Sequence, residues 1–349
     1  APAQNIALAD KDTIAMVMLG RIPNRDPAHT SQGRIPSQGW LTQNRWRGLK
    51  PFTANVGSVN PDSGIVANTN NKITDAPFPD HVSFNWGDTQ RIKRLEKLLN
   101  EREVHTRESF IQAQLDTVSY TARALLPLIA KELWFISDPA PSGTPLRQRQ
   151  IALDLLANWN GEMSEHLPEP LIYDAWLQEL QTYLISDDLG PLASKFAQPD
   201  PVFIERVYRD IDGAARWCDV IQSSRTESCD DIAAVSLDAA ILYLTEKYGD
   251  RIESWRWGQA HQAEHKHEVL GDVRFLGWLT NIRQQTSGGD NTLMRGVARG
   301  TGPEPFTNVH AAVYRAVVDF ADLDSSVFIT STGQSCHFLS RYYDDLAEL

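Results

Sequence analysis

A short histidine-rich segment contains the side chains whose spacing is most typical of metal chemistry. His261, Glu264 and His265 form an H-x-x-E-H pattern, the inverted form of the zinc-peptidase motif. On a helix, the two histidines would share one face and bind zinc, and Glu264 would act as the general base. A third ligand would have to lie downstream, where Glu268 and Glu304 are the candidates. A zinc metallopeptidase is therefore one hypothesis, although histidine-rich segments also meet so short a pattern by chance.

Two other segments approach the loops of known reaction classes but lack a required residue. Gly333-Gln334-Ser335 would begin a nucleophile elbow, but position 337 is histidine where that motif needs glycine. The stretch 287–292 is glycine-rich, but no Gly-Lys-Ser/Thr follows it, which excludes a phosphate-binding loop of the P-loop type. We retain neither motif.

Composition limits the partners that we expect. The 349 residues are 42% hydrophobic, enough for a large core and one or two domains. The formal charge is −12 and the basic residues are scattered, so we expect no nucleic-acid partner. No run of about 18 apolar residues occurs, so we expect no membrane span. The ten tryptophans favour a packed core over an apolar binding pocket.

The three cysteines suggest one disulfide. Cys218 and Cys229 enclose a short polar loop, and a bond between them would stabilise the fold by roughly 3 kcal/mol through loop entropy. An oxidising compartment is consistent with that bond. Cys336 is left over, and no C-x-x-C spacing indicates zinc.

The elements that position these residues begin with a β-hairpin. The apolar runs Ile6–Asp10 and Thr13–Leu19 flank the turn residues Asp10, Lys11 and Asp12. Because a domain rarely begins within a strand, we expect the chain to be a piece of a longer polypeptide. From Arg25 to Pro79 the sequence is rich in Pro, Gly, Asn and Ser, which predicts irregular chain laid over a core.

The middle of the chain has apolar residues at helical spacing. Asp200, followed by proline, predicts one helix start, and Asp230 or Asp231 predicts another. The predicted helices are Thr89–Leu99, a helix capped by Thr106 and running through Leu126, Arg147–Trp159, Leu171–Ile185, Pro201–Trp217 and Ile232–Tyr248.

Near the C-terminus, β-branched and aromatic residues predict two strands, Ala311–Phe320 and Val327–Thr330, buried on both faces. A helical block between two β-rich ends indicates the α+β class rather than alternating βαβ units. We expect one discontinuous domain. In it, residues 1–85 form the hairpin and irregular segment, 86–250 a helical insertion, and 251–349 the closing strands and tail.

Several separated blocks resemble the penicillin acylase (penicillin amidase) family, in the family's order. Residues 333–345 read GQSCHFLSRYYDD, similar to the family's GQSGHPLSPHYDD-like tail. Residues 60–71 are similar to its NPxSGxIANxNN segment, the most specific match in the chain, and 287–292 to its GDxxT turn. In the pattern WxWGxxHxxxFxH, His261 and His267 fall on the family's histidines, in a segment that is not a zinc helix there. The chain resembles the C-terminal part of the β-subunit.

The resemblance implies the fold and reaction of an N-terminal-nucleophile (Ntn) hydrolase. The fold would be part of an αββα sandwich with a helical insertion, and the reaction would release an acyl group from an amine in a linear amide. A Ser or Cys at a processed N-terminus upstream of this chain would attack, with its own α-amino group as base. Asn5 would help to form the oxyanion hole, and Arg25 would orient the groups around the nucleophile. The isolated chain, lacking that nucleophile, would be inactive.

The resemblance also implies partners and a compartment. The partners would be a small acylated amide substrate, the missing α-subunit and the N-terminal part of the β-subunit. The location would be periplasmic or secreted. One structural calcium is possible, with Asp10 as the only candidate ligand, and no other cofactor is expected. Penicillins, cephalosporin side chains and acyl-homoserine lactones all remain open as substrates, and a binding protein descended from the fold is the alternative to an enzyme.

Overall fold

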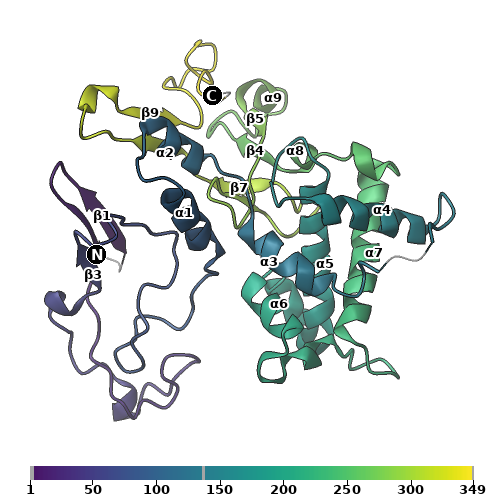
Figure 1. Cartoon of the computed structure of the whole chain (residues 1–349), viewed down its shortest axis with the longest axis horizontal. Helices are drawn as coiled ribbons and strands as arrows, with labels where there is room; N and C mark the ends of the chain where they lie inside the picture. Colours follow the sequence, from purple (N-terminus) through teal and green to yellow (C-terminus); the bar gives the residue numbers. More distant parts are fainter. Residues whose placement is uncertain (1–3, 136–137, 348–349) are drawn as a thin grey trace. The chain divides into compact units, whose positions relative to one another are not determined.

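A computed structural model describes residues 4–135 and 138–347 of the chain (Figure 1). The chain forms two compact units. Residues 1–100 and 318–325 belong to the first, and residues 101–317 and 326–349 to the second. The predicted closing strands thus share a unit with most of the predicted helical insertion.

The first unit contains a three-stranded antiparallel sheet in the order β1-β2-β3. Its strands are β1 (Asn5–Ala9), β2 (Ile14–Met18) and β3 (Gly57–Val59). Asp10 closes the β1–β2 turn, because its Oδ1 accepts the backbone N–H groups of Asp12 and Thr13, both at 2.8 Å. The predicted hairpin is therefore confirmed, and its turn chemistry is that of an Asx turn.

The rest of the first unit is mostly irregular, as the Pro, Gly and Asn content predicts. Two 3₁₀ turns, η1 (Thr42–Asn44) and η2 (Phe52–Ala54), interrupt it. It ends in helix α1 (Gln90–Asn100), close to the predicted 89–99.

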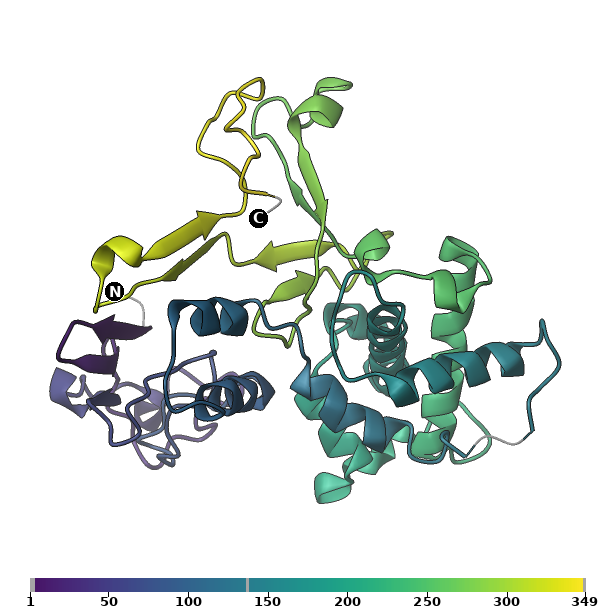
Figure 2. The same cartoon turned by 45° about the horizontal axis from the view of Figure 1, so that its top comes forward.

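The second unit contains most of the helices. They are α2 (Arg107–Gln114), α3 (Tyr120–Ile129), α4 (Pro145–Asn158), α5 (Glu169–Leu189), η3 (Gly190–Lys195), α6 (Pro201–Tyr208), η4 (Ile211–Cys218) and α7 (Cys229–Tyr248). The two longest, α5 and α7, pack side by side (Figure 2). Trp176 of α5 is fully buried there, and its Nε1–H donates to Ala233 O and Ser236 Oγ of α7, both at 3.1 Å.

Three helix predictions were wrong in their limits. The helix predicted from Thr106 through Leu126 is two helices, because Ser119 caps a new one by accepting the N–H of Ala122. The helix predicted over 201–217 ends at Tyr208, where Asp210 takes a left-handed backbone conformation with φ 49°. The N-cap of α7 is Ser228 rather than Asp230 or Asp231, although Asp231 completes the capping box.

A four-stranded sheet of order β5-β4-β7-β6 completes the second unit, together with the hairpin β8-β9. The strands are β4 (Gln262–His265), β5 (Ile282–Gln285), β6 (Gly296–Ala298), β7 (Asn308–Ala311), β8 (Tyr314–Val317) and β9 (Val327–Thr330). Three short helical segments, η5 (Ile252–Ser254), α8 (Trp257–Ala260) and α9 (Leu276–Thr280), precede or connect the strands, and η6 (Leu323–Ser325) lies between β8 and β9.

The closing strands differ from prediction in burial. Strand β9 has the predicted bounds, but the predicted strand 311–320 is broken between β7 and β8. Burial on both faces is wrong, since Tyr314 and Phe328, which stack on each other, are 60% and 67% exposed. The apolar composition of these strands indicates β-structure, but it does not determine whether one or both faces of the hairpin are covered.

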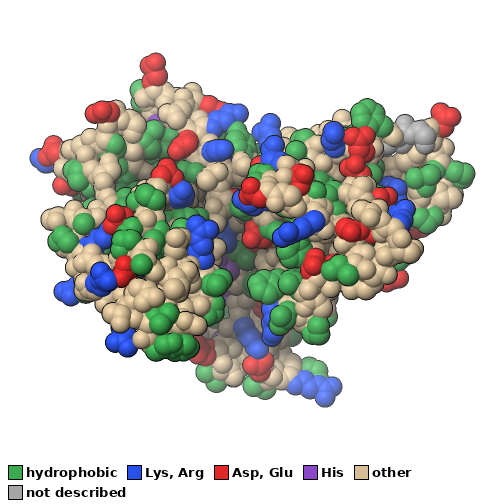
Figure 3. Space-filling model, turned by 90° about the horizontal axis from the view of Figure 1, so that it is seen from below, with side chains coloured by type: hydrophobic (Ala, Val, Ile, Leu, Met, Phe, Trp, Pro, Cys, Tyr) green, Lys and Arg blue, Asp and Glu red, His purple; other side chains and the backbone are tan. Residues whose placement is uncertain are grey.

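The surface charge and the helix lengths also bear on what the sequence predicts. Basic and acidic side chains are interspersed over the face of the molecule drawn in Figure 3. Among the described residues, no helix combines the length and apolar character needed to cross a bilayer.

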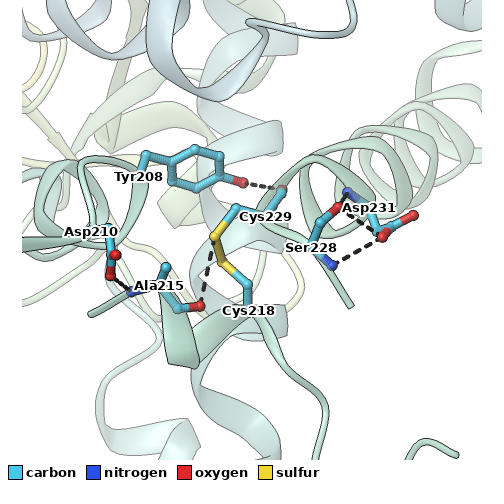
Figure 4. The surroundings of a disulfide bond; sticks show 7 residues. All are labelled: Tyr208, Asp210, Ala215, Cys218, Ser228, Cys229 and Asp231. Carbon is cyan, nitrogen blue, oxygen red and sulfur yellow. Dashed lines mark hydrogen bonds between the residues drawn. A yellow bond between two sulfur atoms is a disulfide. The ribbon is translucent and has the colours of Figure 1, made fainter. Parts of the chain in front are cut away.

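Cys218 and Cys229 are joined in a disulfide, with Cα atoms 5.0 Å apart (Figure 4). The bond ties the end of η4 to the first turn of α7. Tyr208, at the end of α6, donates its hydroxyl hydrogen to the Cys229 carbonyl oxygen at 2.9 Å. Cys336 is an exposed free thiol. The disulfide thus fixes the polar loop 219–228 between two helical segments.

We expect non-reducing peptide mapping of the native protein to find Cys218 joined to Cys229 and Cys336 free. Replacing both bonded cysteines by serine should lower the free energy of unfolding by roughly 3 kcal/mol, because the unfolded chain regains the entropy of that loop. Cys336→Ser is the matched control and should change stability little. Free thiols at both positions in oxidised material would contradict the pairing.

Candidate functional site

Asn5 lies at the start of β1, directly opposite Met18 of β2. Its side chain therefore shares a sheet face with those of Ala7, Met16 and Met18. Asn5 is exposed, and its amide makes no hydrogen bond to any described residue. A side-chain N–H without an internal partner is what an oxyanion donor must offer.

Two asparagines fix the strand against which Asn5 is registered. Asn60 accepts the backbone N–H of Ile14, at the start of β2, at 2.9 Å, and itself takes a left-handed conformation with φ 42°. Asn55 donates to the carbonyl oxygens of Met18 and Gly20 at the other end, at 2.7 and 3.0 Å. Both ends of β2 are therefore held by side-chain amides.

Arg25 follows a short extended segment that is also held by backbone hydrogen bonds. Asn24 N–H donates to Gly48 O at 2.9 Å, and Lys50 N–H donates to Ile22 O at 2.8 Å. The guanidinium of Arg25 donates from Nη1 to the His81 carbonyl oxygen at 3.2 Å, and partial burial lowers its pKa. Arg25 is thus a positioned, partly desolvated cation.

His81, which the sequence did not indicate, is the hydrogen-bond partner of Arg25. Its ring is buried and stacks on Phe84 at 4.2 Å between centroids. Burial lowers the pKa of His81, and the nearby charges of Arg25, Arg34 and Lys50 lower it further. Its Nδ1 has no hydrogen-bond partner among the described residues. No motif surrounds it in the sequence, so only the fold could reveal it.

The structure places Asn5 and Arg25 in the same unit but does not join them. No hydrogen bond links their side chains in the part of the chain that is described. Asn5 is exposed on a strand, while Arg25 reaches toward His81. Their action on one reaction centre therefore stays a prediction.

Asp10, the suggested calcium ligand, uses one carboxylate oxygen within its own turn, where Oδ1 accepts two backbone N–H groups. Calcium takes six to eight oxygen ligands, so calcium binding at Asp10 stays a prediction. Within residues 4–135 and 138–347, no group of three or more His, Cys, Asp or Glu side chains is placed to hold a metal.

The zinc hypothesis requires a helix that is not formed. Glu264 and His265 are consecutive residues of strand β4, so their side chains point to opposite faces of the sheet. Glu264 pairs with Arg283 at 2.8 Å, and this hydrogen bond lowers the pKa of its carboxyl. The H-x-x-E-H spacing therefore does not gather the three side chains around one point.

His261 is instead a structural histidine. Its ring is fully buried and stacks on Trp257 at 4.3 Å, and its Nδ1–H donates to the Phe306 carbonyl oxygen at 2.8 Å. Burial lowers the pKa of His261 to about 4. A Cβ at Gly296 would lie 2.6 Å from His261 Nε2, so only glycine fits there. His267, the second histidine of the pattern, uses its Nδ1 to accept two backbone N–H groups in the next turn.

The second unit has a cavity of about 1320 Å³ between the four-stranded sheet and the C-terminal tail. Its lining includes the polar side chains of Glu264, His265, Asn308 and Tyr343. Arg315 of β8 also lines it, and partial burial lowers the pKa of that guanidinium. No sequence motif marked Arg315.

Comparison with known proteins defines the class. The family model described as penicillin amidase matches residues 1–349, so the chain belongs to the penicillin amidase family. A solved structure, the thermostable penicillin G acylase from Alcaligenes faecalis, aligns with a TM-score of 0.63 at 18% identity, covering 100% of this chain and 63% of that one. The predicted α+β fold of that family is thereby confirmed.

The curated relatives are acylases. The acyl-homoserine lactone acylase QuiP of Pseudomonas aeruginosa is 25% identical over 98% of this chain and 42% of its own length. The penicillin acylase 2 proenzyme of a Pseudomonas species is 24% identical over 95% of this chain and 41% of its own length. The chain thus spans less than half of these relatives.

The depressed pKa of His261 predicts an acid-sensitive fold. Above pH 6.5 the buried, neutral His261 makes its full contribution to the free energy of unfolding. Because the unfolded histidine takes up a proton near 6.5 and the folded one only near 4, stability falls as pH drops between these values, by up to about 3 kcal/mol. His81 and His265, whose pKa values burial also lowers, act in the same direction.

The difference between wild type and His261→Gln isolates this contribution. In urea unfolding at pH 4 to 7.5, the variant should show the flatter pH dependence, whatever its absolute stability. The exposed His166→Gln is the control and should follow the wild-type slope. Parallel curves for wild type and His261→Gln would show that His261 does not titrate as the burial implies.

We also expect the protein to hold no stoichiometric zinc at His261, Glu264 and His265. Elemental analysis after dialysis should find well under one zinc per chain, because these side chains diverge and Glu264 is paired with Arg283. His265→Ala should leave the zinc content unchanged. One zinc per chain, lost in that variant, would restore the metal hypothesis.

Proposed function

We propose that this chain is part of an amide hydrolase that releases an acyl group from an amine in a linear amide. The observation that carries the proposal is the match of the penicillin amidase family model over residues 1–349. The relatives' names, which specify acyl-homoserine lactone and penicillin as acyl donors, support an acylated small molecule as substrate.

The nucleophile of this reaction would be a Ser or Cys at a processed N-terminus outside these 349 residues. Its α-amino group would accept the hydroxyl or thiol proton as the side chain attacks the amide carbonyl. The α-ammonium group would then donate that proton to the leaving amine nitrogen as the tetrahedral intermediate collapses to an acyl-enzyme, which water hydrolyses. Residues supplied by the α-subunit and the N-terminal part of the β-subunit would complete the site.

Asn5 would supply one hydrogen bond to the developing oxyanion. Its exposed amide is free of internal partners, and the strand that carries it is registered against β2. Such a donor contributes about 2.7–4 kcal/mol to the transition state. Arg25 would act by orientation, as a cation already fixed through the His81 carbonyl oxygen. We further propose a periplasmic or secreted location, in keeping with the disulfide.

Asn5→Ala in the complete, processed enzyme should lower the acylation rate by about 10²–10³. Substrate affinity should change far less, because the lost hydrogen bond forms mainly as charge develops on the oxygen. Asn5→Asp, which keeps the shape but replaces the donor by an acceptor, should be at least as damaging. Single-turnover kinetics on an amide substrate separates the two effects.

The neighbouring amide Gln4 provides the matched control. Gln4 is also exposed but precedes β1, and consecutive side chains of an extended chain point to opposite sides, so Gln4→Ala should leave the rate unchanged. If Asn5→Ala retained the wild-type turnover rate, the proposal that β1 contributes to the active site would be wrong. Absence of hydrolysis by the intact wild-type protein on penicillins and acyl-homoserine lactones alike would favour the binding-protein alternative.

A further inference from the structure

A second, smaller cavity of about 320 Å³ lies in the second unit between α5, α7 and the loop 300–306. One face of α5 forms a wall, because Gln178 and Glu179 lie four and three residues before Thr182 and so share that side of the helix. Tyr243 of α7 and Phe306 form an aromatic wall, with ring centroids 6.1 Å apart. The volume is at the lower end of small-molecule sites.

The cavity is lined by a carboxylate without a partner. Glu179 makes no hydrogen bond or ion pair to any described residue, and it is half-buried. Partial burial raises the pKa of its carboxyl, which reflects the lost hydration of the charged form. A half-buried charge without a counter-ion is unfavourable, and a cation in the cavity would relieve it.

The other polar groups of the wall also offer acceptors. Gln178 donates its Nε2–H to Asp174 Oδ2 at 2.8 Å, which leaves its Oε1 free to accept. Thr182 donates its hydroxyl hydrogen to the Gln178 carbonyl oxygen at 2.9 Å, which leaves its oxygen lone pairs. The ligand that complements these groups is a donor of several hydrogen bonds.

Lys247 of α7, which contacts the loop bordering the cavity, does not neutralise Glu179. Lys247 donates to the Glu304 carboxylate at 2.7 Å and to the Pro303 carbonyl oxygen at 2.9 Å, so its charge is used at the cavity's edge. The loop itself is held in place, since Gly300 packs so closely on Gln198 that a Cβ there would lie 1.9 Å from its Oε1. The loop that borders the cavity is thus fixed on one side.

We propose that this cavity is a binding site for a small organic ammonium ion. The ammonium group donates to the Glu179 carboxylate and to Gln178 Oε1, while its hydrocarbon part packs on Tyr243 and Phe306. Aromatic faces also attract the cation directly. The site is independent of the proposed amide hydrolysis, since it uses neither Asn5 nor Arg25.

Benzylammonium is a suitable probe, with benzyl alcohol as its neutral counterpart of nearly equal size. Isothermal titration calorimetry on the complete protein should show binding of benzylammonium and none, or far weaker binding, of the alcohol. Glu179→Gln, which removes the charge and keeps the shape, should lower the affinity for benzylammonium by about 10- to 100-fold. Tyr243→Leu should weaken it as well by removing the aromatic wall.

Glu246→Gln is the matched control, because Glu246 is an exposed carboxylate of α7 outside the cavity. It should leave the affinity unchanged, as should Asn5→Ala, which would lower only amide hydrolysis. Benzylammonium affinity that is the same in wild type and a folded Glu179→Gln variant overturns the proposal, and so does equal affinity for the alcohol. If the protein hydrolyses no amide but binds benzylammonium in a way that depends on Glu179, the proposed function is wrong and the ammonium site is still supported.

Discussion

The packing of α5 on α7 is the interaction on which the second unit depends. Trp176 is fully buried between them, and its indole N–H reaches two acceptors of α7. Because a buried aromatic contributes both area and an N–H that must be satisfied, this contact fixes the relative position of the helices as well as stabilising them. Helix α4 packs on both members of this pair and α3 packs on α7, while α6 packs on α3 and η4. The disulfide ties the start of α7 to η4.

Two carboxyl groups, those of Asp174 and Asp290, interact electrostatically between α5 and the turn that precedes β6. Asp174 of α5 is buried, and burial together with the charge of Asp290 raises its pKa to about 8. Asp290 accepts the backbone N–H of Ala298 in β6 at 3.1 Å and the amide of Gln198, also at 3.1 Å. The turn that contains Asp290 thus joins the segment after η3 to strand β6. Its contacts are structural, although its glycine-rich sequence resembles a phosphate-binding loop.

Local chemistry in the sequence predicted much of the fold. The Asp10 turn, the Asp200 cap and the apolar spacing of α1 each depend on neighbouring residues, and local sequence was enough to predict them. The breaks at Ser119 and Asp210 were missed because apolar spacing continues across them. His261, Glu264 and His265 were misleading for a related reason. Their spacing suits a helix, but pairing with β5 makes the segment a strand, and tertiary pairing overrides local pattern.

The site was predicted less completely, because a sequence motif can identify the family without showing what each of its residues does. Residues 60–71 are the most specific family match, yet Asn60 does no chemistry in this structure. It accepts the N–H of Ile14 and so fixes the end of β2, while Asn55 holds the other end. Strand β2 in turn sets the register of β1 and therefore of Asn5. The segment thus supports the proposed oxyanion donor from a distance, because a hydrogen bond to a transition state is effective only when its donor is held in place beforehand.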